Sequence, residues 1–144
     1  MRVNFIATLV VILGLATSTK AQEKELSPEF RTCLDKAVTN PEFAECSGAE
    51  IKRQEALLTT AWARVSSRMK RFDEVSLTGD HSHAALLKEQ RSWIVYKDAS
   101  CRYFDNREAF GREGEVIHFG VCRVGVLMQR VKELNDLIEF LKPR

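Results

Sequence analysis

The stretch from Leu86 to Cys101 constrains the fold of this chain more than any other. Its side chains repeat at steps of three and four residues, which is the spacing of one face of an α-helix. The positions on or beside that face are Leu86, Leu87, Gln90, Trp93, Ile94, Lys97 and Cys101. Gln90 and Lys97 are polar, and a polar group on a buried face needs hydrogen-bond partners. The sequence therefore predicts an amphipathic helix that carries a polar seam into a core and ends in a cysteine.

The first 21 residues have the pattern of an export signal. An apolar run extends from Phe5 to Ala16, and the small residues Thr19 and Ala21 occupy the positions used for cleavage. We expect residues 1–21 to be a signal peptide and residues 22–144 to form one domain, located in the periplasm or secreted. An uncleaved membrane anchor is the alternative, although the apolar run is short for a membrane span.

The charge balance bears on the class of partner. Arg2 and Lys20 lie in the expected signal peptide, and without them the 22 basic residues fall to 20, which equals the 20 acidic residues. A neutral chain with interspersed charges has no sequence footprint for nucleic acid and no polybasic patch for a membrane. We therefore expect a protein partner, no nucleic acid, and membrane contact only through the signal segment.

All four cysteines lie in the expected mature chain, and an even number in an oxidising compartment favours two disulfides. Four cysteines allow three pairings. We favour Cys33 with Cys46 and Cys101 with Cys122, because each pair then joins a helix end to the start of the next helix. The alternative is a zinc site of four thiolates, which the absence of any CxxC pair disfavours.

Four segments carry helical signals, and none alternates with the two-residue period of a strand. Ser27, Pro28 and Glu29 have the residue types of a helix start, and this first, short helix is expected to reach about Val38. Asn40-Pro41 is expected to end it, because the residue before a proline avoids the helical conformation.

Three longer helices are expected to follow. Ser47 and Glu50 have the spacing of a capping box and predict the start of the second helix, whose apolar seam includes Glu55. Turn residues between Ser76 and Ser82 precede the third helix, and residues 105–115 predict the longest loop, before the fourth helix. We therefore predict an all-α fold: a small antiparallel helical bundle of three long helices plus one short N-terminal helix, linked by two disulfides.

Polar residues in or near the helical seams form one candidate site. They are Glu55, Gln90, Arg91, Lys97, Asp98 and Arg130. We interpret them as a structural network that fixes helix register, because charges inside a bundle are normally paired. The sequence shows no Ser/His/Asp or Cys/His arrangement and no glycine-rich phosphate loop, and disulfide-bonded cysteines are not nucleophiles. We therefore expect no enzymatic activity and no cofactor.

Several motifs in combination resemble one known family. They are Cys33, Cys46, AEIKRQEALL, KEQRSWIVYKDASC, Cys122, Arg130 and Glu133-Leu134. Over about residues 30–134 the chain resembles the LprI-like lysozyme-inhibitor domain of exported bacterial proteins. It differs from the usual family pattern at Glu55, Trp62 and Lys97, where Asp, Tyr and Arg are usual, and also at Thr59 and Leu127, where Asn and Thr are usual. Most of these changes keep the charge sign or the bulk.

The resemblance implies a small secreted helical domain that blocks a peptidoglycan hydrolase such as lysozyme, whose catalysis depends on a pair of carboxyl groups in a cleft. Because the mature chain is neutral, we expect a protruding loop to bind the enzyme rather than an acidic face. The candidate loop residues are Asp80, His81, His83, Arg107, Phe110 and Arg112. The alternative function is a periplasmic structural or envelope-interaction module without inhibitory activity.

Histidines raise the further alternative of a zinc site. His81 and His83 with Asp80 and the distant His118 supply ligand types that zinc accepts. A structural zinc ion requires four converging ligands, and the sequence does not bring His118 near the other three residues. We therefore expect no bound metal.

Overall fold

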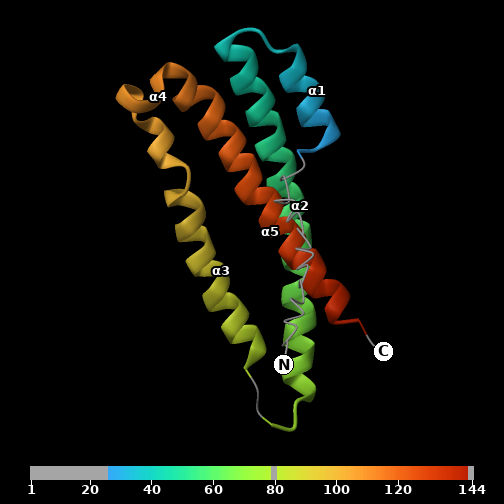
Figure 1. Ribbon diagram of the computed structural model, residues 1–144. Helices are drawn as coiled ribbons and strands as arrows, with labels where there is room; N and C mark the ends of the chain where they lie inside the picture. Colours follow the sequence, from blue (N-terminus) through green and yellow to red (C-terminus); the bar gives the residue numbers. More distant parts are fainter. Residues whose placement is uncertain (1–25, 79–80, 143–144) are drawn as a thin grey trace, which may run out of the picture.

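Helices account for the fold. The computed structural model describes residues 26–78 and 81–142, and these residues contain no strand. The long helices α2 (Asn40–Val75), α3 (Ser82–Ala99) and α5 (Phe119–Phe140) run antiparallel in chain order, and the short α1 (Pro28–Lys36) lies beside the start of α2 (Figure 1). The predicted all-α bundle is confirmed. The expected signal peptide lies outside the described residues.

Helix α1 begins where the sequence predicts. Ser27 Oγ accepts a hydrogen bond from the backbone N–H of Phe30 at 3.2 Å, and Pro28 occupies the first turn. The helix ends at Lys36, slightly before the expected Val38, whose side chain is exposed. Phe30 is fully buried and packs in one cluster with Cys46 and Val124, which joins α1 to both α2 and α5.

The expected start of the second helix is wrong by eight residues. Helix α2 begins at Asn40, and its capping box consists of Thr39 and Glu42 rather than Ser47 and Glu50. The Glu42 carboxylate accepts hydrogen bonds from the backbone N–H groups of Val38 and Thr39, both at 2.8 Å, which lower its pKa. Asn40-Pro41 therefore opens a helix instead of closing one, because proline is tolerated in a first turn.

Ser47 has a packing role inside α2. It is buried, and a Cβ placed on Gly120 of α5 would lie 2.5 Å from Ser47 Oγ. Only glycine at position 120 permits this close approach of the two helices.

Both predicted disulfides are confirmed. Cys33 joins Cys46 with a Cα–Cα distance of 5.7 Å, and Cys101 joins Cys122 with a Cα–Cα distance of 5.9 Å. The first bond links α1 to α2, and the second links the end of α3 to α5. Cys101 has φ 69°, so the chain leaves α3 through a left-handed residue.

The segment between α3 and α5 is not the loop that we expected. It consists of a 3₁₀ turn η1 (Arg102–Asp105), a short helix α4 (Arg107–Glu113) and a π turn η2 (Gly114–His118) that continues into α5. We call residues 101–118 the tip. In Figure 1 it lies at the end of the molecule opposite the connection between α2 and α3.

The main core lies between α2 and α5. Ala61 and Val65 of α2 pack with Leu134 of α5 and with Leu86, the one residue that α3 buries among those described. Within the described residues, no helix combines the length and the apolar character needed to cross a bilayer.

Candidate functional site

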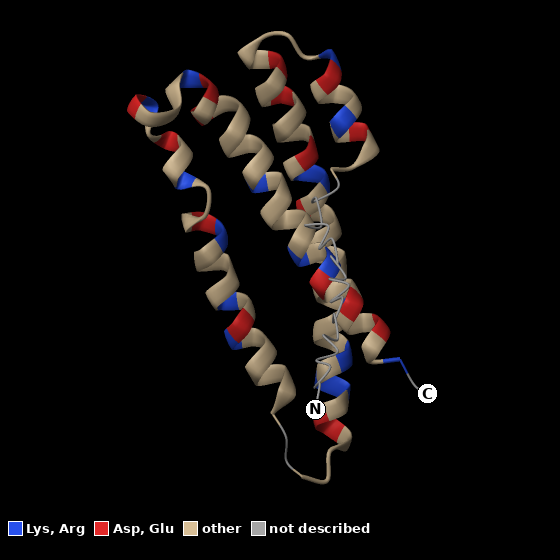
Figure 2. Ribbon diagram, in the orientation of Figure 1, with Lys and Arg blue, Asp and Glu red and all other residues tan. Residues whose placement is uncertain are grey.

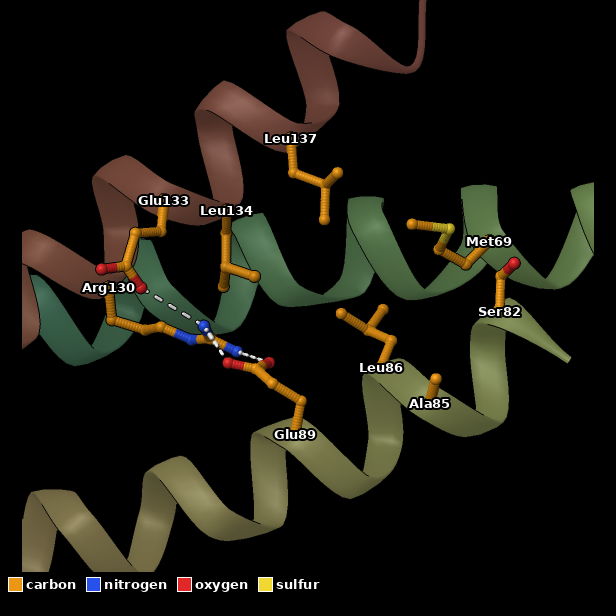
Figure 3. A pocket seen from close by; sticks show the side chains of 9 residues that line it. All are labelled: Met69, Ser82, Ala85, Leu86, Glu89, Arg130, Glu133, Leu134 and Leu137. Atoms are coloured by element: carbon orange, nitrogen blue, oxygen red, sulfur yellow. Dashed lines mark hydrogen bonds and ion pairs between the residues drawn. The ribbon is translucent and has the colours of Figure 1, made fainter.

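A buried arginine occupies the centre of the seam between α3 and α5. The guanidinium of Arg130, 5% exposed, donates to both carboxylate oxygens of Glu89 and to Glu133 Oε2 at 3.3 Å (Figure 3). It donates to Gln90 Oε1 at 2.7 Å as well. It also lies 5.5 Å from the centre of the Trp93 ring. The structure therefore brings Gln90 and Arg130 together, and it adds Glu89 and Glu133, which the predicted polar network did not include.

A second polar cluster lies nearer the tip. Arg123 donates to Asp98 Oδ1 at 3.1 Å, and Lys97 Nζ lies 3.5 Å from the same oxygen. The hydrogen bond from Arg123, followed by the charge of Lys97, lowers the pKa of Asp98. The predicted network is thus divided into two clusters, and Arg123 completes the second.

Two expected members of the network lie outside both clusters. Glu55 has an exposed side chain because the buried face of α2 is rotated by about one residue from the expected seam. Arg91 lies on α3, where its side chain is also exposed. The buried polar residues of α2 are instead Ser47, Glu50 and Gln54. Their spacing of three and four residues, continued by Ala61 and Val65, is the signal that would have identified this face.

Glu50 anchors a third polar group, near α1. Its carboxylate is 4% exposed and accepts from Arg53 at 2.7 and 2.9 Å and from Gln54 at 2.8 Å. Burial alone would raise the pKa of Glu50, but side-chain hydrogen bonds with Arg53, Gln54 and Ser27 outweigh that effect, so the pKa lies below its ordinary value.

A groove of about 470 Å³ opens beside Arg130, between α2, α3 and α5. Its walls are Met69, Ser82, Ala85, Leu86, Glu89, Arg130, Glu133, Leu134 and Leu137 (Figure 3). The floor is apolar, and the guanidinium is already compensated by two carboxylates. The Arg130 guanidinium is therefore not free to bind a charged ligand, and its ion pair with Glu89 holds α3 against α5.

The tip is held in one conformation by several contacts. The Cys101–Cys122 disulfide fixes its base, and Asn106 Oδ1 caps α4 by accepting from two backbone N–H groups at 3.1 and 3.2 Å. Arg107 and Glu115 form an ion pair at 2.6 Å across it. Gly114 is required here, because a Cβ at this position would lie 2.2 Å from Phe110 Cβ.

Four rings form a cluster on the tip. Phe104 contacts Tyr103, Phe110 and His118, with ring centroids 4.4, 5.2 and 5.5 Å away. Phe104 is half-buried, whereas Tyr103 is 61% exposed and Phe110 is 42% exposed. The side chain of Arg112 is also exposed, and it makes no ion pair or hydrogen bond with any other residue that the structure describes. The tip therefore presents two aromatic rings and an exposed arginine that is free to contact a partner.

The other candidate loop is tied to the bundle. His83 Nε2 lies 2.9 Å from Ser66 Oγ, and the Asp73 carboxylate accepts from the backbone N–H groups of Ser82 and His83. His81 is exposed, and Asp80 lies outside the described residues. His118 lies at the far end of α3 from His81 and His83, so the three histidines do not converge. No cluster of three metal-binding side chains occurs in residues 26–78 and 81–142.

Comparison with known proteins adds family evidence to this geometry. The model of the family described as Lysozyme inhibitor LprI matches residues 33–134, which include both disulfides, the Arg130 cluster and the tip. The uncharacterized protein R02472 of Rhizobium meliloti (strain 1021) is 28% identical over 135 residues, covering 91% of this chain and 92% of that protein. No solved structure matches the chain. The family match spans well over half of the sequence, and the chain therefore belongs to the LprI family of lysozyme inhibitors.

Proposed function

We propose that this protein is an exported, non-enzymatic inhibitor that blocks the active-site cleft of a lysozyme-type peptidoglycan hydrolase. The family match over residues 33–134 is the observation that carries the proposal. Two disulfides agree with an oxidising location such as the periplasm. In this proposal residues 1–21 direct export, and residues 22–144 form the working domain.

The tip is the proposed binding surface. Tyrosine and arginine are enriched among the residues that dominate binding energy at protein interfaces, and the tip presents both types. The disulfide, the Asn106 cap and the ion pair between Arg107 and Glu115 hold it in place before binding, so little conformational entropy is lost on association. The loop before α3 is less suited, because His83 already bonds to α2.

Arg112 gives the tip a chemical means of blocking the reaction. Lysozyme-type catalysis needs one carboxyl group that stays protonated and acts as the general acid. A guanidinium placed against such a pair would favour the ionised form of both groups and lower the pKa of the acid. Inhibition would then combine exclusion of the glycan with loss of the catalytic proton.

The test is a titration of an animal lysozyme with the oxidised protein purified after export, using cell-wall lysis as the readout. We expect inhibition at near-stoichiometric protein. Arg112→Gln and Tyr103→Ala should each raise the half-inhibitory concentration at least tenfold, because they remove the cation and one aromatic anchor. The matched control is Arg71→Gln at the other end of the molecule, which should inhibit like the parent.

Two outcomes would oppose the proposal in different ways. Unchanged lysozyme turnover at a large excess of folded protein would remove inhibition of this enzyme as the function. Normal inhibition by Arg112→Gln and Tyr103→Ala would retain inhibition and reject the tip as the surface. Circular dichroism of each variant verifies that the helices remain folded.

A further inference from the structure

A stripe of arginines lies on α2 near its C-terminal end. Arg64, Arg68 and Arg71 follow one another at steps of four and three residues, so they share one face of the helix. Together with Lys142 they line a groove of about 460 Å³ at the end of α5. Figure 2 shows Lys and Arg gathered in this part of α2, beside the end of α5. The neutral charge count of the expected mature chain did not reveal this local concentration of positive charge.

The stripe lacks carboxylate partners within the described chain. Arg68 donates to the backbone carbonyl of Leu141 at 2.9 and 3.1 Å, and Arg71 donates to Ser67 Oγ at 2.7 Å. Arg64 has an exposed side chain without a hydrogen bond or ion pair to any described residue. By contrast Arg53, Arg107, Arg123 and Arg130 are all paired with carboxylates. Like charges at this spacing repel, and an external anion would relieve that repulsion.

Nearby acidic groups do little to cancel the stripe. Asp73 faces the first turn of α3, where it accepts from two backbone N–H groups. Glu139 is paired with Lys142. Glu74 is exposed on α2 and makes no ion pair with another described residue, and Lys70 beside it carries the opposite charge.

Exposed apolar side chains lie directly beyond the stripe. Phe72 is 45% exposed, Val75 74% and Phe140 77%, and Leu77 is fully exposed. Phe72, Val75 and Phe140 line a second groove, of about 520 Å³, which shares Lys142 with the arginine groove. The apolar and basic surfaces are therefore continuous. We call this surface, formed by residues 64–77 and 138–142, the basic end.

The order of these residues along α2 matches the depth profile of a membrane interface. At about 1.5 Å per residue, Val75 lies about 6 Å beyond Arg71 and about 10 Å beyond Arg68. Interfacial proteins bury apolar side chains about 5–10 Å into the boundary between headgroups and acyl chains, with basic residues at the level of the phosphates. We propose that the basic end docks onto a bilayer surface rich in anionic lipid.

An anionic bilayer fits the basic end better than a nucleic acid or a second copy of the chain does. A nucleic acid or another polyanion would use the arginines but leave the exposed Val75, Leu77 and Phe140 in water. A second copy of the chain would cover the apolar residues but bring two arginine stripes together. Docking at this end would also leave the tip directed away from the membrane (Figure 1). The inference goes beyond the proposed function and does not depend on it.

The test is sedimentation of the exported, oxidised protein with vesicles of phosphatidylglycerol and phosphatidylethanolamine, compared with vesicles of phosphatidylcholine alone. We expect binding to the anionic vesicles that weakens at least tenfold when the salt concentration rises from 50 to 500 mM, since exposed charges are then screened. The double variant Arg64→Glu with Arg71→Glu should lower the binding at least tenfold, and Val75→Ser with Phe140→Ser should lower it severalfold. Arg112→Gln is the matched control and should bind like the parent.

Three results with vesicles would overturn the proposal. They are equal binding to both kinds of vesicle, anionic-vesicle binding unaffected by the charge-reversal variant, and the absence of binding to any vesicle. If sedimentation without lipid instead shows self-association that Phe140→Ser abolishes, the apolar surface is a contact between copies of the chain. If the protein retains a nucleic acid duplex but no vesicle, the stripe is a general polyanion site. In both of these cases the lipid proposal fails.

Discussion

Helix α5 and helix α3 are held in the bundle by different means. Helix α5 buries Val124, Leu127 and Leu134 almost completely, and it meets α2 closely where Gly120 touches Ser47. Helix α3 buries only Leu86 among its described residues, although both helices are long. Its remaining described attachments are mainly polar or covalent, and they include the Arg130 cluster, the Asp98–Arg123 ion pair, the His83–Ser66 contact, the Asp73 cap and the Cys101–Cys122 disulfide. Packing therefore stabilises the α2–α5 pair, whereas directed bonds position α3 and the tip that follows it.

The largest effect on stability should come from a change in the packing between α2 and α5. Leu134→Ala removes a side chain that is 1% exposed, and we expect it to lower the free energy of unfolding by about 2–5 kcal/mol through lost burial and a cavity. The matched change on α3 is Ile94→Ala, where the parent side chain is 43% exposed and the expected cost is below about 1 kcal/mol. Urea denaturation measures the free energy of unfolding of both variants. Equal losses for Leu134→Ala and Ile94→Ala would contradict the view that packing stabilises α5 more than α3.

The second largest effect should come from the covalent attachment of α3. Replacing Cys101 and Cys122 with serine opens a loop with a sequence separation of 21 residues, for which chain entropy predicts a loss of about 3 kcal/mol. Hydrogen exchange should then accelerate in α3 and the tip more than in the α2–α5 pair. Uniform acceleration across the three long helices would mean that α3 unfolds together with the pair.

Arg130 should have a smaller effect on stability. Arg130→Gln loses most of the hydrogen bonds to Glu89 and Glu133, and we expect a loss of about 1–3 kcal/mol, since both carboxylates are half-exposed and regain water. The control is Arg91→Gln, an exposed residue of α3 that should change stability by less than about 0.5 kcal/mol. If Arg130→Gln left the free energy of unfolding unchanged, the polar cluster would not be needed to hold α3 in the bundle.

The smallest effect concerns pH. The folded-state pKa of Asp98 is lowered by Arg123, so its ionised form favours the folded state at pH values above the unfolded pKa, about 4. This contribution should disappear as the pH falls below 4 and through the lowered pKa. Asp98→Asn should therefore flatten part of the fall in melting temperature between pH 5 and pH 2. If the melting temperatures of Asp98→Asn and of the parent fell in parallel between pH 5 and pH 2, Asp98 would not contribute to the pH dependence of stability.

Sequence patterns were sufficient wherever a local rule governs the structure. The Ser27 cap, the helical class, the direction of the bundle and both disulfide pairings follow from spacing and residue type. The start of α2 was predicted wrongly because the sequence offers two capping boxes, one at Thr39 and one at Ser47. The box at Thr39 is the one that forms, since Phe30 of α1 packs against Cys46 in the first turns of α2. The apolar pattern predicted that Glu55 faces the core, but Gln54 is buried and Glu55 is exposed. A buried face predicted from apolar residues alone can therefore be displaced by one residue.

Features assembled from distant segments were not accessible to such rules. The tip depends on contacts of Phe104 with Phe110 and His118, which the sequence separates by 6 and 14 residues, so it appeared as a glycine-containing loop. The basic end needs α2 and the end of α5 side by side, whereas a charge count averages over the chain. Of the predicted loop residues, Phe110 and Arg112 lie exposed on the tip, and His83 is bonded within the bundle.

The central claim is that the rigid tip, and not the basic end, meets the hydrolase. Hydrogen exchange of the oxidised protein, alone and saturated with lysozyme, tests this claim most directly, because it reports the footprint without a mutation. The account predicts slower exchange confined to residues 101–118 and the adjoining start of α5. Protection centred on residues 64–77, or an unchanged exchange pattern at saturating enzyme, would contradict it.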